Sequence, residues 1–149
     1  MKIVLDTNVL SELMKPQGSQ TVKSWVAAQP RENLFTTSIN QAEILSGIAI
    51  MPEGKRSQAL QESAQAMFTE DLVGQILFFD SDSANCFAQI TSDRRKKGKP
   101  IAQADALIAS ICLANNAAIV TRNVDDFLDC QITIINPFAQ KTGLNPDDL

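Results

Sequence analysis

The chain has 149 residues, of which 44% are hydrophobic, and a formal net charge of -4 at pH 7, so we expect one domain with a sizeable core. It contains no histidine and no tyrosine, which excludes serine-histidine hydrolases, histidine-based RNA cleavage and HExxH metalloproteases. Its three cysteines are widely spaced without a CxxC pair, which argues against a disulfide framework and for a reducing compartment.

Strands and helices are expected to alternate along the chain. The apolar run 2–6 predicts a buried strand with Asp6 at its carboxyl end, and Thr7 and Asn8 are expected to cap a helix that Pro16 ends. The later segments are, in order, a helix over 19–28, a strand over 34–37, a helix over 40–50 capped by Ser38, an amphipathic helix over 55–72, a short strand or connection at 76–79, helices over 83–97 and 101–115, and strands over 118–121 and 132–135.

This alternation predicts an α/β fold with a central parallel sheet of four to five strands and helices on both faces. Ligands of such sheets gather at the carboxyl ends of the strands. We expect one domain over residues 1–138, followed by a polar tail over 139–149. The amino terminus shows no apolar signal region and no run reaches membrane-spanning length, so we expect a cytoplasmic protein.

Acidic residues occupy positions where carboxylates are costly. Asp6 follows a fully apolar strand; it could simply cap the next helix, but Asn8 is an equally good cap and leaves Asp6 free to face the crevice. Glu43 lies four residues after Ile39 and seven before Ile50, which places it on their core-facing stripe. A small slip in helix phase would instead return Glu43 to solvent.

Two further acidic positions lie in the second half of the chain. Asp105 precedes Ile108 and Cys112 on a mainly apolar helix face. Stabilisation of the helix dipole is the simpler explanation for an acid near the start of a helix, but it does not explain why this acid lies on the face that points to the core. Asp125 and Asp126 follow a predicted buried strand, where turn chemistry alone could explain them. Several carboxylates buried together normally require a cation, and hard ions such as Mg2+ or Mn2+ prefer carboxylate oxygens.

Positive charge is concentrated in one short stretch. Five of the 13 basic residues fall just before the helix of Asp105, namely Arg94, Arg95, Lys96, Lys97 and Lys99. They could contact RNA phosphates, as could Arg122 near the acidic positions, although cations also suit the carboxyl end of a helix without any ligand.

Four motifs occur in order: LDTNVL at 5–10, the helix of Glu43, GKPIAQAD at 98–105 and TRNVDDF at 121–127. With them the chain resembles the PIN-domain ribonucleases, more narrowly the VapC toxins of type II toxin-antitoxin pairs, and residues 47–55 are similar to their FitB-like branch. The resemblance implies a PIN-like fold and a Mg2+- or Mn2+-dependent endoribonuclease that hydrolyses RNA. It also implies a cognate antitoxin and a homodimer.

The resemblance carries over to individual positions. It assigns the four catalytic and metal-binding acids to Asp6, Glu43, Asp105 and Asp126, the last because the pattern TRNxxDF places its acid immediately before Phe127. It also gives supporting roles at the site to Thr7, Asn8, Thr121 and Asn123.

Two other functions stay open from the sequence. An aspartyl phosphatase of the haloacid dehalogenase type would use the aspartate after the first strand as nucleophile, but that family needs DxDx[TV] and Asn8 occupies its second acid. A non-catalytic binding module with the same fold would hold RNA or a protein through the basic cluster. Such a module would not depend on the four acids.

Overall fold

The computed structural model describes residues 1–139; the predicted tail, apart from its first residue, lies outside the described residues. Five strands form one parallel sheet in the order β3-β2-β1-β4-β5. Their bounds are β1 Ile3–Leu5, β2 Leu34–Thr37, β3 Ile76–Leu77, β4 Ala118–Val120 and β5 Ile134–Ile135. The predicted parallel sheet is confirmed, and the segment at 76–79 contains a strand.

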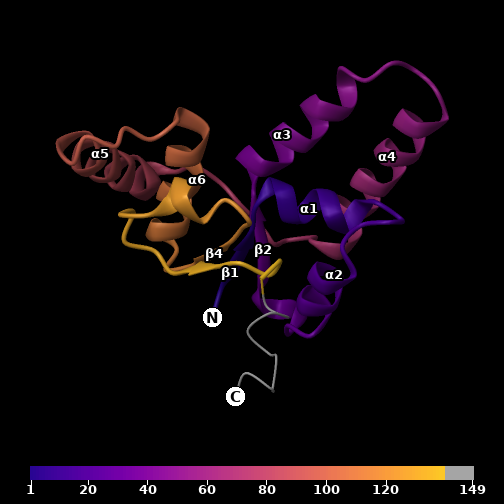
Figure 1. The fold of residues 1–149 in the computed structure, drawn as a ribbon, viewed down its shortest axis with the longest axis horizontal. Helices are drawn as coiled ribbons and strands as arrows, with labels where there is room; N and C mark the ends of the chain where they lie inside the picture. The colour runs from indigo at the N-terminus through magenta and orange to yellow at the C-terminus, as the bar shows by residue number, and fades with distance from the viewer. Residues whose placement is uncertain (140–149) are drawn as a thin grey trace.

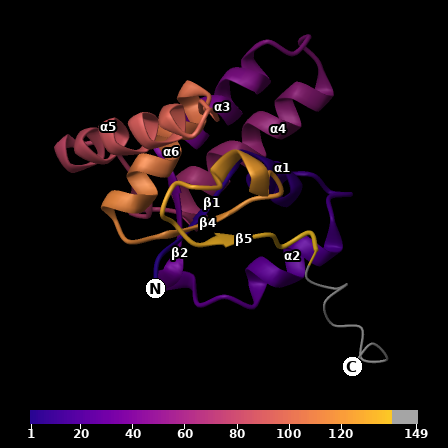
Figure 2. The same ribbon diagram turned by 60° about the vertical axis from the view of Figure 1, so that its left-hand side comes forward.

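The described residues contain six α-helices: α1 Thr7–Met14, α2 Gln20–Ala27, α3 Ser38–Ala49, α4 Lys55–Ala66, α5 Ser81–Lys96 and α6 Gln103–Ala114. The same residues also form the short 3-10 helices η1 Arg31–Asn33 and η3 Val124–Phe127 and the π-helix η2 Met67–Asp71. Figures 1 and 2 show α3 and α4 side by side in one arm and α5 and α6 paired in another. Within residues 1–139, no helix has the length and apolar character needed to cross a membrane.

The sheet separates two apolar cores, because successive side chains of a strand point to opposite faces. Ile3 and Leu5 of β1 face the helices α1 to α4, whereas Val4 faces α5, α6 and η3. In β4, Ile119 joins Val4 in the second core. Helices therefore cover both faces, as the sequence predicts, and both central strands are buried on both sides.

The strand order predicts a crevice at the carboxyl ends of β1 and β4. The chain moves from β1 through β2 to β3 on one side, then crosses back to add β4 and β5 on the other. In parallel sheets, connections diverge at such a reversal and leave an open crevice beyond the strand ends. Asp6 and Thr121 directly follow the two strands that flank it.

Several helix starts differ from the predicted ones. The first helix begins at Thr7 and Asp6 is its cap, so Asp6 caps the helix and also lies at the carboxyl end of β1. Thr37, rather than Ser38, caps α3 through its hydroxyl, which accepts from the amide of Asn40. The helix of Asp105 begins two residues later than predicted, at Gln103.

The buried centre of the sheet allows a test of the second core. Ile119 is fully buried in β4 between Val4 and α6. Ile119→Ala removes apolar contacts and leaves a cavity, so we expect the free energy of unfolding to fall by about 3 kcal/mol. Urea denaturation measures this, with Val73→Ala as the control because Val73 is 63% exposed. Equal losses in both variants would contradict the two-core arrangement.

Candidate carboxylate site

Asp6 is a buried carboxylate held by four hydrogen-bond donors. Its side chain is 5% exposed. Oδ1 accepts from the Thr7 amide at 2.8 Å and from Nδ2 of Asn40 at 2.9 Å. Oδ2 accepts from the Thr121 hydroxyl at 2.7 Å and from Nδ2 of Asn8 at 3.4 Å. All four donors are neutral, so they fix the orientation of the carboxylate without cancelling its charge.

Residues predicted to support the site do meet at Asp6. Thr121 is fully buried and its hydroxyl also accepts from Nδ2 of Asn8 and from the amide of Asn123. Asn8 in turn accepts the amide hydrogen of Arg122 at 3.1 Å. Asn123 therefore contributes through its backbone, and the carboxyl ends of β1 and β4 are joined by one polar network.

Asn40 is a central residue of this network that the sequence analysis does not single out. It is fully buried on α3, and its Nδ2 donates to Asp6 and, at 3.1 Å, to the Thr7 hydroxyl. Its Oδ1 accepts from the Thr37 hydroxyl at 2.6 Å. The available sequence signal is its spacing, four residues before Ile44 on the buried face, where an asparagine needs polar partners.

Glu43 reaches the site from an exposed position, so its predicted core-facing phase is wrong. The buried stripe of α3 contains Asn40, Ile44 and Ile48, whereas Ile50 is 82% exposed. Glu43 lies beside this stripe, and its Oε1 accepts from the Thr7 hydroxyl at 2.5 Å. A hydroxyl of α1, rather than burial, connects Glu43 to the network.

Asp105 lies in the first turn of α6 and is partly buried. Burial and the charges of Asp126, Asp6 and Glu43 together raise its pKa to about 6, while the charge of Arg94 opposes the shift. Burial also raises the pKa of Asp6, against the hydrogen bonds from Thr121, Thr7 and Asn40, and Asp126 adds to the increase. The four predicted acids are thus close enough to repel one another.

Asp126 is the member of the η3 turn whose charge acts on both Asp6 and Asp105. Both Asp125 and Asp126 are exposed in this turn, which follows β4 directly. The turn is closed by the Asp126 amide, which donates to the Asn123 carbonyl at 3.1 Å. The electrostatic coupling therefore agrees with the choice of Asp126 from the motif.

The charge of this cluster is not neutralised by ion pairs. The two ion pairs formed within residues 1–139 join Lys15 to Glu12 and Lys97 to Asp129, and neither includes one of the four acids. Repulsion among carboxylates in a partly desolvated crevice favours binding of a cation. The candidate ligand atoms of the four acids are all carboxylate oxygens, which fits a hard ion such as Mg2+ or Mn2+. As the side chains stand, however, no three acidic or cysteine side chains of the described part are gathered closely enough to hold a metal ion.

The predicted basic contacts divide into two groups. Arg94 is only 7% exposed and its guanidinium donates to backbone carbonyls, so its prediction as an RNA contact is wrong. Arg95, Lys96 and Lys99 are exposed, and Lys97 is exposed but paired with Asp129 at 3.2 Å. The guanidinium of Arg122 lies 4.3 Å from the centre of the Phe138 ring, in a cation-π contact.

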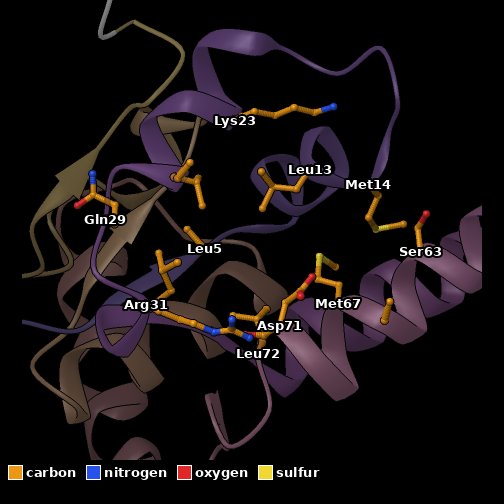
Figure 3. Close-up of a pocket in the computed structure, with 14 residues that line it drawn as sticks. Leu5, Leu13, Met14, Lys23, Gln29, Arg31, Ser63, Met67, Asp71 and Leu72 are labelled. Atoms are coloured by element: carbon orange, nitrogen blue, oxygen red, sulfur yellow. The ribbon is translucent and has the colours of Figure 1, made fainter.

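A groove of about 660 Å³ lies away from the acids, between α1, α2 and the end of α4. Figure 3 shows apolar side chains around it, including Leu13, Met14 and Met67, with Lys23 and Arg31 at its edges. None of the four acids lines it. One carboxylate, Asp71, lines the groove beside its apolar side chains.

Comparison with known proteins identifies similar chains. The PIN domain family matches residues 3–130. The VapC ribonuclease Y4jK of Sinorhizobium fredii is 37% identical over 91% of this chain and 97% of its own length. Toxin FitB of Neisseria gonorrhoeae is 33% identical over 91% of this chain and 98% of its own. The crystal structure of FitAcB from Neisseria gonorrhoeae superposes with a TM-score of 0.85 at 33% identity, covering 91% of this chain and 98% of that one.

The raised pKa of Asp105 predicts a pH-dependent loss of stability in chelator-treated protein. The folded state holds the proton up to about pH 6, whereas the unfolded chain releases it near its ordinary pKa of 3.8. Stability therefore falls as pH rises through this interval. Asp105→Asn cannot ionise, so above pH 6 we expect it to exceed the wild type by about 1 kcal/mol, allowing for solvent screening. Urea unfolding at pH 4 and pH 7 measures this; the same difference at both values would rule it out.

Proposed function

This chain belongs to the PIN domain family, and on that premise we propose that it is a metal-dependent endoribonuclease acting as the toxin of a toxin-antitoxin pair. The family predicted from the sequence motifs is confirmed by the match over residues 3–130. The aspartyl phosphatase hypothesis is wrong, because the family and the fold are those of PIN proteins. The relatives named VapC ribonuclease and Toxin FitB support the RNA-cleaving, toxic activity.

The observation that carries the proposal is the mutual repulsion of four carboxylates, none of which takes part in an ion pair within residues 1–139. We propose Asp6 and Asp105 as principal ligands of Mg2+ or Mn2+, with Asp126 as an outer ligand and Glu43 as a ligand or a base. When bound, such an ion lowers the pKa of water and neutralises charge on phosphate oxygens. The donor chemistry of the four residues fits this ion.

The residues of the chain have distinct tasks in this mechanism. Asn40, Thr121 and the Thr7 amide keep the Asp6 oxygens in a fixed orientation before substrate arrives. Glu43 is exposed and is held by the Thr7 hydroxyl at one oxygen, which leaves its other oxygen free to orient a water molecule or accept its proton. Hydrolysis would leave a 5'-phosphate and a 3'-hydroxyl.

RNA binding requires positive charge beside the acidic crevice. We propose Arg95, Lys96, Lys99 and Arg122 as phosphate contacts, since all four are exposed. Lys97 would join them by exchanging its contact with Asp129 for an RNA phosphate. Contacts of this kind weaken as salt concentration rises, because binding releases counterions from the RNA.

A toxin of this class implies protein partners. We propose a cognate antitoxin, one segment of which enters the acidic crevice, and a homodimer of this chain. The naming of the Neisseria relative as a toxin supports the antitoxin. We place the reaction in the cytoplasm, in keeping with three cysteines that are all free.

A non-catalytic module that binds RNA or protein is the alternative function. The observation in its favour is that no three acidic side chains of residues 1–139 gather closely enough to hold a metal ion as they stand. Such a module would retain its binding when the acids are replaced. Cleavage assays therefore separate the two functions.

RNA cleavage provides the main test. Purified protein incubated with total RNA and Mg2+ should degrade the RNA, and Asp6→Asn or Asp105→Asn should reduce the rate by about a hundredfold or more, because each removes a proposed ligand. Glu62→Gln is the matched control, since Glu62 is an exposed carboxylate on α4 away from the crevice. RNA left intact by the wild type at generous Mg2+ would refute the enzyme.

Metal binding should also stabilise the fold. Mn2+ relieves carboxylate repulsion and binds the folded state, so it should raise the melting temperature of the wild type. The increase should be much smaller in Asp105→Asn, which lacks both the charge and the ligand oxygen. Thermal melting with and without Mn2+ measures the two shifts, and equal shifts would count against a metal ligand at Asp105.

A further inference from the structure

Arg94 is a buried guanidinium whose contacts are with backbone carbonyls rather than carboxylates. It lies in the last turn of α5 and is 7% exposed. Neither ion pair formed within residues 1–139 includes it. A buried charge is costly unless polar groups compensate it, and here backbone carbonyls do so.

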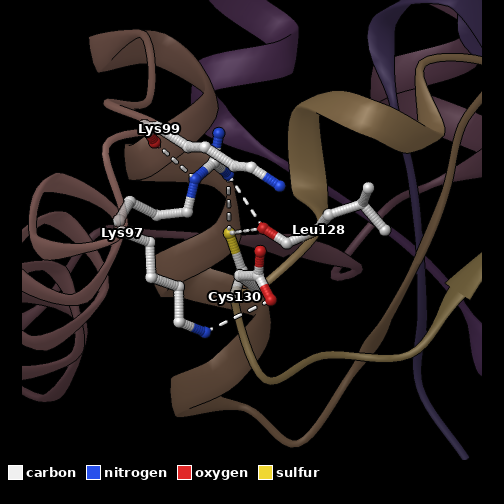
Figure 4. A network of polar contacts seen from close by, with 6 residues as sticks. Lys97, Lys99, Leu128 and Cys130 are labelled. Atoms are coloured by element: carbon white, nitrogen blue, oxygen red, sulfur yellow. Dashed lines mark hydrogen bonds and ion pairs between the residues drawn. The ribbon is translucent and has the colours of Figure 1, made fainter.

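The contacts of Arg94 join two segments that are far apart in the sequence. Its Nε donates to the Lys99 carbonyl at 2.7 Å, and its Nη1 donates to the carbonyls of Asp126 at 3.0 Å and Leu128 at 2.9 Å. Nη1 also lies 3.6 Å from Sγ of Cys130. Figure 4 shows Lys99 on one side of this network and Leu128 and Cys130 on the other.

Each of these segments carries one of the proposed metal ligands. The Asp126 carbonyl belongs to a proposed ligand itself, so its bond fixes the backbone from which that carboxylate extends. Lys99 lies in the short connection between α5 and α6, and α6 carries Asp105 in its first turn. The connection is tied twice, because the Lys99 amide also donates to the Arg94 carbonyl at 2.9 Å.

We propose that Arg94 is a positioning residue of the carboxylate site, which fixes Asp126 relative to Asp105 by joining the η3 turn to the connection before α6. The inference rests on the proposed function of that site. Planar guanidinium geometry suits the role, since one rigid group donates in several directions at once, whereas a lysine ammonium on a flexible stem does not reproduce that fork. Side chains that orient metal ligands typically contribute tenfold to a hundredfold in metal affinity.

A role in positioning and a role as a mere positive charge predict opposite effects on metal affinity. Removing a cation near a metal site strengthens Mn2+ binding by electrostatics alone. Removing a group that orders the ligands weakens it. The sign of the change in the Mn2+ dissociation constant therefore distinguishes the two roles without any measurement of RNA cleavage.

The experiment is isothermal titration calorimetry of the full chain with Mn2+, for the wild type, Arg94→Gln and Arg94→Lys. We expect both variants to bind Mn2+ about tenfold more weakly, although Arg94→Lys retains the charge. Arg56→Gln is the matched control: Arg56 is an exposed arginine on α4 and is not among the proposed RNA contacts, so its loss should leave Mn2+ affinity unchanged. Fluorescence of Trp25, which packs in the opposite core, verifies the fold of each variant.

A double-mutant cycle locates the effect. In an Asp126→Asn background, Arg94→Lys should weaken Mn2+ binding by much less than tenfold, because the ligand that it positions is already lost. Tighter Mn2+ binding in Arg94→Gln, or wild-type affinity in Arg94→Lys, would overturn the inference while leaving the proposed function intact. Failure of Arg94→Lys to fold would also overturn it, since Arg94 would then serve the fold. Absence of Mn2+ binding by the wild type would instead refute the metal site itself.

Discussion

The buried carboxylate of Asp6 is the group on which the rest of the site depends. It follows β1 at the reversal of the strand order, where the sheet opens a crevice, and the Thr121 hydroxyl binds it from the end of β4. This bond connects residues 115 positions apart and joins the two central strands at their carboxyl ends. Every other acid of the cluster is placed relative to Asp6, through the Thr7 hydroxyl, the first turn of α6 or the turn after β4.

Holding several carboxylates close together weakens the fold, because their negative charges repel one another. Asp105 illustrates the conflict, because burial and three neighbouring acids oppose its ionisation. A salt bridge would remove the conflict, but it would also neutralise the charge that the proposed cation requires. Functional sites commonly retain such unfavourable arrangements, and the buried apolar layers on both faces of the sheet supply the compensating stability.

The parts of the site that follow strand ends could be predicted from the sequence, whereas those that depend on tertiary partners could not. Asp6 is predictable because a buried parallel strand delivers the residue after it to the crevice. Which face of α3 is buried could not be predicted, because that face includes Asn40, a polar residue that a search for hydrophobic periodicity does not count. Arg94 resembles the four surface cations that follow it, and its burial depends on carbonyls of residues 126 and 128, more than 30 positions away.

Two kinds of donor order the acids, and neither forms an ion pair with them. Neutral groups surround Asp6, so its orientation is fixed while its charge stays available. Arg94 carries a full charge but directs it to the carbonyls of Lys99, Asp126 and Leu128, so the cation orders the backbone rather than the carboxylates. A guanidinium paired directly with Asp105 or Asp126 would compete with a divalent ion for the same oxygens. Binding carbonyls instead allows the chain to use a charged residue for rigidity while the crevice remains acidic.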